Sequence, residues 1–453
     1  MHCSASRWPS RSISRAARRA RSRYASSPRR RVSRRCGADL MLLAALTLAA
    51  QAAALPCQPG AYAGPDGRFM VVMERPDTAQ TGAWRWWADD GRFGLTNDGS
   101  VVCRGDTLDV KQVVYKKVAL RLTPSKFKSG DLTLNGLLIE PPAAPGRKPP
   151  LTVLVHGSER YSAVKGASYP WLLAAQGIAA FVYDKRGTGE SQGTYNQNFH
   201  ALAGDAAAAS KEAKRLAAGR YSRFGLLGGS QGGWVAPRAA NDAGADFVAV
   251  GFGLLIDPLE EDASQVAAEL TEAGYGADIL KQAREITDAT GNLMAEHFKQ
   301  GYEQLAAVKA RYAGQPWFAK IKGEFTGDVL ALDEATLRRE GAAKFDNLEL
   351  DWRYDAMGWL RKVKVPQLWV IAAEDREAPP QTTIDRLQTL RREGHDVAIV
   401  RFPDTDHGMV EFTQDAKGER TATRVTDGYF RLLGDWIKGK TRPPYGRGEF
   451  LTK

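Results

Sequence analysis

Cysteine is scarce in this sequence. Four cysteines occur among 453 residues, and two of them, Cys3 and Cys36, lie in an Arg/Ser-rich beginning. No Cys-x-x-Cys pair and no Cys/His cluster is present, so the sequence gives no sign of a metal site. The other two, Cys57 and Cys103, are expected to form a disulfide if the protein is exported, and two free buried thiols are the alternative.

A hydrophobic run of about 20 residues, long enough to span a bilayer, is also missing. The apolar stretch LMLLAALTLAAQAAA at residues 40–54 follows a basic segment and ends with Ala52 and Ala54 at A-x-A spacing. This order is typical of a secretory signal peptide. We predict a leader at residues 1–54, cleavage near Ala54, and a periplasmic or secreted protein without stable membrane insertion. An uncleaved anchor is the alternative, and Met41 is a second candidate start.

Acidic residues are nearly absent from the first forty positions, which hold twelve arginines and one acid, Asp39. This excess equals the formal net charge of +11 of the whole chain, so the rest of the chain is close to neutral. A basic surface for the phosphates of a nucleic acid is therefore not expected.

Residues 55–111 predict a small β-rich module. Asp-Gly pairs at positions 66, 90 and 98 are typical of hairpin turns between short strand-like runs. The run WRWW at residues 84–87 is expected to pack a small core, and a sugar-stacking surface is the alternative.

Residues 112–252 alternate short apolar runs with helical patterns. This order predicts an α/β fold with a mostly parallel central sheet and helices on both faces. The strand-like runs at residues 112–123 and 130–141 are expected to open that sheet.

Residues 253–351 carry apolar residues at helical period. They predict a helical insertion that lies as a lid over the carboxyl edge of the sheet. The strand-helix order is expected to resume over residues 352–440, and residues 441–453 to form a surface tail.

The stretch GLLGGSQGGW places Ser230 in a Gly-x-Ser-x-Gly pattern between a strand-like run and a helix pattern. A serine on so sharp a turn adopts strained dihedral angles, and Gly228 and Gly232 leave room for its neighbours. The turn exposes the hydroxyl as a nucleophile and points the next amide, of Gln231, toward the reacting centre. A phosphate-binding P-loop is excluded because no Lys-Ser/Thr pair follows the second glycine.

A serine nucleophile needs a general base, which is most often histidine near neutral pH. His407, in the loop FPDTDHGM after a strand-like run, is the candidate base. Asp375, in WVIAAEDREAPP after another such run, is expected to orient it, with Glu374 and Glu377 as alternative acids. The nearby Asp406 is expected to be a solvated charge.

An acyl-transfer site also needs amide donors for the developing oxyanion. The second donor is expected in the loop VLVHGSERYS, after the first long parallel strand. There the Ser158 N–H would join the Gln231 N–H, and His156 is expected to support the loop.

Five motifs, VHGS, YDKRGTGES, GGSQGG, EDREAPP and DHGM, occur in this order and together resemble the α/β-hydrolase superfamily. They are most similar to its bacterial carboxylesterase and serine-aminopeptidase-like branch, over about Val113 to Lys440. The resemblance implies the α/β-hydrolase fold. It assigns a structural turn to Asp184, Arg186, Gly187, Gly189 and Ser191. Two positions depart from the family pattern: Ala372 replaces a common glycine, and Glu159 follows VHGS.

The combined expectation is an exported serine hydrolase that cleaves carboxylic esters through an acyl-enzyme on Ser230. Its partner would be a small-molecule ester or a short peptide, and no metal or organic cofactor is implied. A peptidase that trims N-terminal residues is the first alternative. It needs an acid for the substrate amine, and Glu260, Glu261 and Glu296 are available in the lid. A non-catalytic binding protein on the same scaffold is the second.

Overall fold

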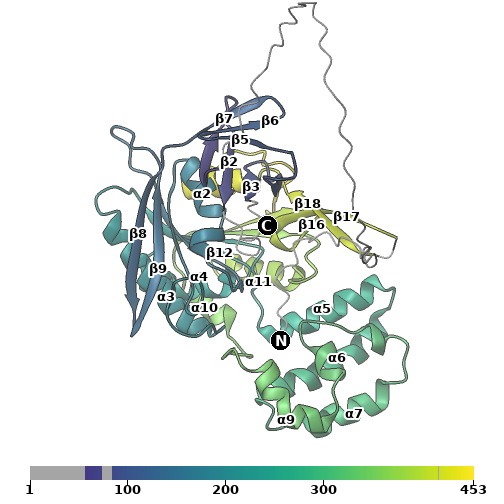
Figure 1. The fold of residues 1–453 in the computed structure, drawn as a ribbon. Coiled ribbons are helices and arrows are strands. Elements are labelled where there is room, and N and C mark those ends of the chain that lie inside the picture. Colours follow the sequence, from purple (N-terminus) through teal and green to yellow (C-terminus); the bar gives the residue numbers. More distant parts are fainter. Residues whose placement is uncertain (1–56, 74–83, 417, 453) are drawn as a thin grey trace, which may run out of the picture.

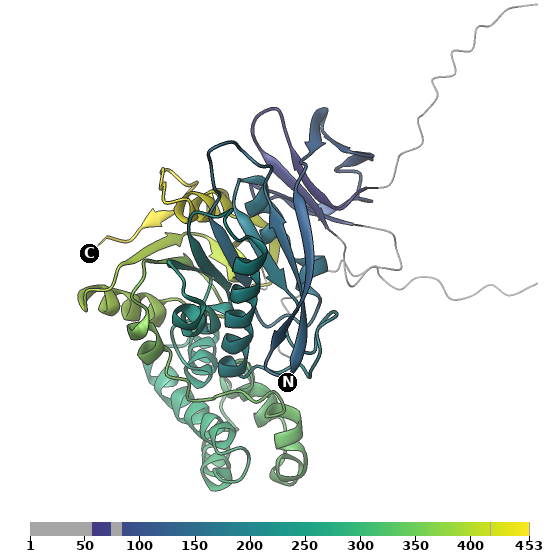
Figure 2. The same ribbon diagram turned by 90° about the vertical axis from the view of Figure 1, so that its left-hand side faces the viewer.

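The computed structural model describes residues 57–73, 84–416 and 418–452. The predicted leader and its cleavage site therefore lie outside the described residues. A large α/β core occupies the middle of the molecule, with a β module at one end and a group of helices at the other (Figure 1 and Figure 2). Within the described ranges, no helix is both long and apolar enough to cross a membrane.

The N-terminal module is a seven-stranded antiparallel sheet in the order β4-β3-β2-β1-β7-β6-β5. Its strands are β1 (Gly60–Ala63), β2 (Phe69–Met73), β3 (Arg85–Ala88), β4 (Phe93–Leu95), β5 (Val102–Arg104), β6 (Thr107–Val110) and β7 (Val113–Lys117). The prediction that the run at residues 112–123 opens the main sheet is wrong for β7, because β7 pairs with β1 and β6. The module sheet thus extends to Lys117 rather than ending at residue 111.

The WRWW run packs a core, which confirms that interpretation of its tryptophans. Trp86 and Trp87 are 5% and 6% exposed and point to opposite faces of β3. Trp86 packs inside the module, and Trp87 packs in a core shared with the main sheet. The predicted pair Cys57 and Cys103 forms a disulfide that joins the segment before β1 to β5.

The main sheet has nine strands in the order β19-β15-β14-β13-β12-β10-β11-β9-β8. The strands from β10 to β15 pair in parallel, whereas β8, β9 and β19 pair antiparallel. Their bounds are β8 (Arg121–Ser129), β9 (Leu132–Glu140), β10 (Leu151–Val155), β11 (Ala179–Tyr183), β12 (Phe224–Gly229), β13 (Phe247–Gly251), β14 (Gln367–Ala372), β15 (Val397–Phe402) and β19 (Glu449–Phe450). The central strands are buried along their whole length because both faces of the sheet are covered. The expected tail contributes β19 to the sheet edge.

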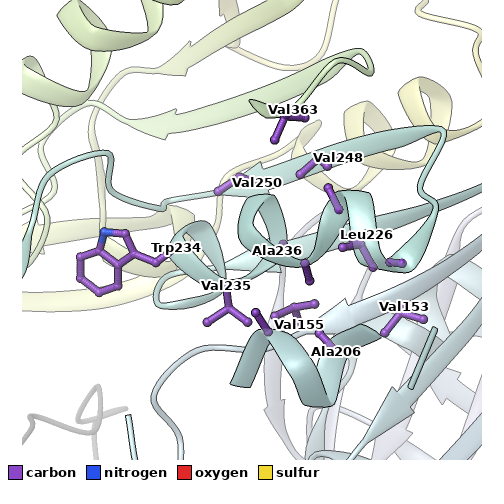
Figure 3. Close-up of a cluster of buried hydrophobic side chains, with 14 of the residues drawn as sticks. Val153, Val155, Ala206, Leu226, Trp234, Val235, Ala236, Val248, Val250 and Val363 are labelled. Atoms are coloured by element: carbon purple, nitrogen blue, oxygen red, sulfur yellow. The ribbon is translucent and has the colours of Figure 1, made fainter. Parts of the chain in front are cut away.

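Helices cover both faces of this sheet. One face carries α3 (Phe199–Leu216), α4 (Gly232–Ala243), α10 (Ala356–Lys362) and α11 (Gln381–Arg392). The other carries α1 (Ala163–Gly166), α2 (Tyr169–Ala175), α12 (Tyr429–Ile437) and the N-terminal module. Figure 3 shows part of the first core, in which Val155, Leu226 and Val248 of the sheet cluster with Ala206 of α3 and Ala236 of α4.

The predicted helical insertion lies between β13 and β14 and has a hydrophobic core of its own. It consists of α5 (Pro258–Glu272), α6 (Ala277–Ala295), α7 (Tyr302–Tyr312), the 3-10 turn η1 (Phe318–Lys320), α8 (Thr326–Leu330) and α9 (Glu334–Phe345). Side-chain contacts tie α5 to the α/β core. The Gln265 side chain donates to the Glu377 carbonyl (2.6 Å), and Arg386 pairs with Glu260 (2.7 Å). The insertion is thereby held beside the carboxyl ends of the strands.

A three-stranded sheet follows β15 and connects the histidine loop to the N-terminal module. It contains β16 (Thr405–Asp406), β17 (Val410–Gln414) and β18 (Arg420–Val425), with the short turn η2 (His407–Met409) after β16. The Val425 N–H donates to the Gly91 carbonyl (2.9 Å), and Arg424 donates to the Asp90 carbonyl (2.6 Å). The module therefore packs directly against the segment that carries His407.

Candidate active site

Ser230 lies on a tight turn between β12 and α4. Its φ is +52°, in the left-handed region that residues with side chains rarely adopt. A Cβ on Gly228 would collide with the Gly232 carbonyl, and a Cβ on Gly232 would collide with the Val155 carbonyl. The turn therefore needs glycine at both positions, because of the crowding that was expected from the sequence. It places Ser230 at the carboxyl edge of the sheet.

His407 lies within hydrogen-bond distance of both predicted partners. Its Nε2 is 3.0 Å from Ser230 Oγ, and its Nδ1 is 2.9 Å from Asp375 Oδ2. The Asp375 carboxylate is 5% exposed and also accepts the Ala378 N–H (2.7 Å). Phe252, just after β13, packs edge-on against the imidazole with ring centroids 5.1 Å apart. Because β12 to β15 run in parallel, their carboxyl ends bring together residues that are distant in sequence.

The two alternative acids lie elsewhere around the histidine. Glu374 pairs with Arg420 at 3.3 Å. Glu377 faces the opposite ring nitrogen from Asp375, with its Oε1 3.6 Å from His407 Nε2. Of the three acids, only Asp375 contacts Nδ1 within the described residues.

Asp406 is not the solvated charge that the sequence predicted. Its carboxylate accepts the N–H groups of His407 (2.9 Å) and Arg376 (3.0 Å) and pairs with Arg420 (2.8 Å). The reason is local: the side chain caps the turn η2 that begins at His407. Asp406 thus fixes the backbone of the histidine loop.

Ser158 and Gln231, the predicted oxyanion donors, line one pocket together with Ser230. Gln231 is the first residue after the nucleophile and opens α4. The carbonyl of Ser158 accepts the Tyr195 hydroxyl (2.6 Å), which fixes the loop after β10.

Lys185 is a residue of this region that sequence reasoning missed, because the motif YDKRGTGES was interpreted only as a structural turn. Its side chain is buried, and the ammonium donates to the Gly157 carbonyl. The signal was present in the sequence, since a lysine two residues after an apolar strand lies at the crowded carboxyl edge of the sheet.

Glu159, one of the two departures from the family pattern, contacts His156 at 3.4 Å. Burial raises the pKa of Glu159, but the hydrogen bond and charge of His156 and the charge of Lys185 outweigh it and lower the pKa to about 2. Glu159 is therefore ionised and holds His156 at the base of the loop. This contact agrees with the supporting role expected for His156.

The turn of YDKRGTGES is held by a dense set of hydrogen bonds. The Asp184 carboxylate accepts the Ser162 hydroxyl (2.8 Å) and the Val164 N–H (3.0 Å). Arg186 makes a two-pronged pair with buried Asp205, at 2.7 and 2.8 Å. These contacts fit the structural role that the family resemblance implies.

The pocket at Ser230 is lined by the core on one side and the insertion on the other. The insertion and its return segment contribute Pro258, Glu261, Glu324, Phe325, Leu350 and Trp352. Of the three acids considered for a substrate amine, only Glu261 reaches this pocket, since Glu260 pairs with Arg386 and Glu296 ends α6. Glu324 was missed because no sequence motif marks it.

Burial and neighbouring acids shift the protonation of this site. Burial raises the pKa of Glu261 well above its usual range, and the charges of Glu324 and Glu377 add to that effect. Burial also raises the pKa of Glu377 to about 7, although the charge of His407 opposes it. Burial lowers the pKa of His407, but the charges of Asp375, Glu377 and Glu261 outweigh it and raise the pKa above its usual value. The pocket thus favours the protonated forms of these groups.

Several solved structures of hydrolases are similar to this chain. Pyrococcus horikoshii acylaminoacyl peptidase is 17% identical, with a TM-score of 0.43 over 80% of this chain and 49% of that one. Est1E from Butyrivibrio proteoclasticus, solved with ferulic acid, is 15% identical, with a TM-score of 0.39 over 70% and 96%. The esterase Pf2001 of Pyrococcus furiosus is 16% identical, with a TM-score of 0.39 over 64% and 84%. The chain spans about half the length of the peptidase.

None of the curated proteins compared with the chain matches it. The model of the alpha/beta hydrolase family matches residues 152–422, which is more than half of the chain. The matched segment includes the strands β10 to β15, the helical insertion and the loops that carry Ser230, Asp375 and His407. The sheet order, the strained serine turn and this match agree, and the protein is a member of the alpha/beta hydrolase family.

Proposed function

We propose that this protein is an exported serine hydrolase that cleaves carboxylic esters through an acyl-enzyme on Ser230. The observation that carries the proposal is the continuous series of short distances from Asp375 through His407 to Ser230, which opens into a pocket. A strained turn, a base within 3.0 Å and a buried carboxylate behind the base are the parts that serine activation needs.

In the proposed reaction, Ser230 Oγ attacks the ester carbonyl carbon while His407 Nε2 accepts the hydroxyl proton. The oxyanion is held by the N–H groups of Ser158 and Gln231. Collapse of the tetrahedral intermediate breaks the C–O bond, and the leaving alcohol takes the proton from Nε2. Water then attacks the acyl-enzyme by the same steps, and Asp375 stabilises the imidazolium each time.

The pocket walls suggest that part of the substrate is apolar. Trp234 and Trp352 both line the pocket, and both indole N–H groups are already used within the protein. Trp234 donates to the Ile256 carbonyl (2.7 Å), and Trp352 donates to Asp346 (2.9 Å). Their rings therefore present carbon surfaces, which favour an aliphatic or aromatic group of the ester.

The central test replaces the nucleophile. Ser230→Ala should lower p-nitrophenyl ester hydrolysis by at least about 10³-fold without a change in thermal unfolding, because the attacking oxygen is lost and the packing is kept. Ser210→Ala is a matched control, since its buried hydroxyl bonds only within α3. A fluorophosphonate probe should label Ser230 in the unmodified protein. Undiminished activity in Ser230→Ala defeats the proposal, and absence of labelling favours a binding protein.

Hydrolysis of substrates with a free amine is the second candidate function. The observation that favours it is the Glu261 carboxyl group, which lines the pocket of Ser230 together with a second acid, Glu324. A substrate ammonium would be held there while its neighbouring carbonyl lies at the nucleophile.

The two candidates differ in their response to Glu261→Gln. If the substrate carries an amine, this variant should raise KM for an aminoacyl p-nitroanilide at least about 10-fold and leave neutral esters unchanged. Glu260→Gln is the matched control, because Glu260 is adjacent on α5 but pairs with Arg386. Equal effects on charged and neutral substrates would leave the simple ester as the better assignment.

A further inference from the structure

We propose that Lys185 is a positioning residue that aims the two amide donors of the oxyanion hole. This inference rests on the proposed function and extends it to a residue that has no part in the triad. It is carried by the contacts of a buried ammonium group with the two segments that bear Ser158 and Gln231.

Lys185 is the second residue after the end of β11, which pairs in parallel with β10, so its side chain starts beside the loop after β10. Only 3% of the residue is exposed. Its ammonium donates to the Gly157 carbonyl and lies 3.4 Å from Gln231 Oε1. The ammonium also lies 5.1 Å from the centroid of the Tyr195 ring, and Tyr195 itself holds the Ser158 carbonyl.

The first contact fixes the direction of one donor. The Gly157 carbonyl and the Ser158 N–H belong to the same peptide unit, which is planar and trans. The Ser158 N–H therefore points in the direction opposite to the Gly157 carbonyl, which accepts the hydrogen bond from Lys185. A cation on that carbonyl oxygen also polarises the peptide and makes its N–H a stronger donor.

The second contact acts on the other donor. Gln231 is 4% exposed, and its side-chain oxygen accepts from the same ammonium while its backbone N–H borders Ser230. One charged group thus links the loop after β10 to the start of α4. If either segment moved, the distance between the two amide donors would change, and the oxyanion would lose a short hydrogen bond.

A buried cation is costly unless several groups compensate it. Here the Lys185 ammonium lies near a carbonyl, a side-chain amide and an aromatic face, and it interacts favourably with the charge of Glu159. A purely structural lysine would satisfy the same description. The two roles differ in kinetics, because an aimed donor acts on the transition state and a structural contact acts on folding.

The experiment compares Lys185→Met, Lys185→Arg and the control Lys214→Met. Lys214 also donates to a backbone carbonyl, that of Ala243 (2.6 Å), and lies over an aromatic ring, but its partners lie at the far ends of α4 and β12. The readouts are kcat and KM for a p-nitrophenyl ester, and the affinity for a trifluoromethyl ketone, which adds to the serine as an oxyanion.

Lys185→Met should lower kcat about 10- to 100-fold and change KM less than about 3-fold. It should lower the affinity for the trifluoromethyl ketone by a factor similar to the loss in kcat. Lys185→Arg should recover most of kcat, and Lys214→Met should match the unmodified protein. If Lys185→Met does not fold, Lys185→Gln replaces it, because glutamine keeps a hydrogen-bond donor group without the charge. Lys185→Gln should also lower kcat more than it changes KM, but by a smaller factor.

An unchanged kcat in folded Lys185→Met or Lys185→Gln overturns the inference, as does an equal loss in affinity for substrate and for the ketone. Fluorophosphonate labelling of the unmodified protein separates this failure from that of the proposed function. If the probe labels Ser230, the hydrolase assignment stands whatever Lys185 does. If it does not, the proposed function itself fails.

Discussion

At the residue scale, the proposed chemistry depends on one alcohol in a strained conformation and one imidazole near several carboxyl groups. The positive φ of Ser230 is stabilised by close backbone packing at the neighbouring glycines. Asp375 and Glu377 face different nitrogens of His407 and differ in exposure. The buried Asp375 contacts Nδ1, whereas Glu377 borders Nε2, the nitrogen that we propose exchanges protons with Ser230.

Glu377→Gln should move the acidic limb of the kcat/KM–pH profile to lower pH. The negative charge of Glu377 raises the pKa of His407, and the base works only when it is unprotonated, so removing that charge extends activity downward in pH. Stopped assays over a pH series check this. Glu374→Gln, which removes an exposed carboxylate paired with Arg420, should leave the limb in place. An unmoved limb in Glu377→Gln contradicts the role assigned to its charge.

The same variant should change stability with a defined sign. Folding raises the pKa of Glu377 from 4.5 to about 7, so its contribution is fully present below pH 4.5 and is lost as pH rises through 7. Glu377→Gln should therefore gain stability relative to the unmodified protein at pH 8, on the order of 2–3 kcal/mol, and gain little at pH 4. Denaturant unfolding at both pH values checks this. An equal gain in stability at pH 4 and pH 8 would contradict the predicted direction of the pH dependence.

At the element scale, β18 joins the N-terminal module to the loop of His407. Gly91 has a φ of +88° and lies so close to β18 that a Cβ would collide with the Val425 carbonyl. Helical period in the sequence predicted the insertion between β13 and β14 because its helices bury one apolar stripe each. Sequence pattern misplaced β7, because a strand-like run does not show which of two sheets the strand will join.

Gly91→Ala should destabilise the protein more than Gly67→Ala. Both glycines have positive φ, but a Cβ at Gly67 meets nothing within 4 Å, so only Gly91→Ala must also displace β18. We expect a difference of at least about 2 kcal/mol in unfolding free energy, together with a lower kcat for Gly91→Ala. Thermal unfolding and ester hydrolysis measure the two effects. Equal melting temperatures would show that the module is not coupled to the loop.

At the scale of the whole molecule, three packed units meet around one sheet. The module and the insertion lie at opposite ends (Figure 2). Loops at the carboxyl edge of the sheet bring Ser230, His407 and Asp375 together. The disulfide lies in the module, which joins the core through Trp87 and β18. Its formation would suit an oxidising compartment, in agreement with the proposed export.

Replacing both Cys57 and Cys103 by serine should lower stability by about 4 kcal/mol, because the crosslink closes a segment of 46 residues in the unfolded chain. The kcat for ester hydrolysis should stay within about 2-fold, since neither cysteine contributes to the pocket. Thermal unfolding with and without a reductant checks this. The reductant should lower the melting temperature of the unmodified protein only, and an equal response in the double variant would contradict the assignment.

Spacing along the chain singled out Ser230, His407 and Asp375 as candidates, with Glu374 and Glu377 as alternative acids, because each candidate follows an apolar run that ends at the carboxyl edge of a parallel sheet. The glycines around Ser230 and the scarcity of other candidate bases were visible in the composition. Contacts between distant elements could not be predicted from the sequence. They include the choice of the acid that reaches Nδ1 of His407, the link that Lys185 makes between two loops, and the gathering of Glu261, Glu324 and Glu377 near His407. These depend on side-chain direction and burial, which arise only when strands far apart in sequence pack side by side.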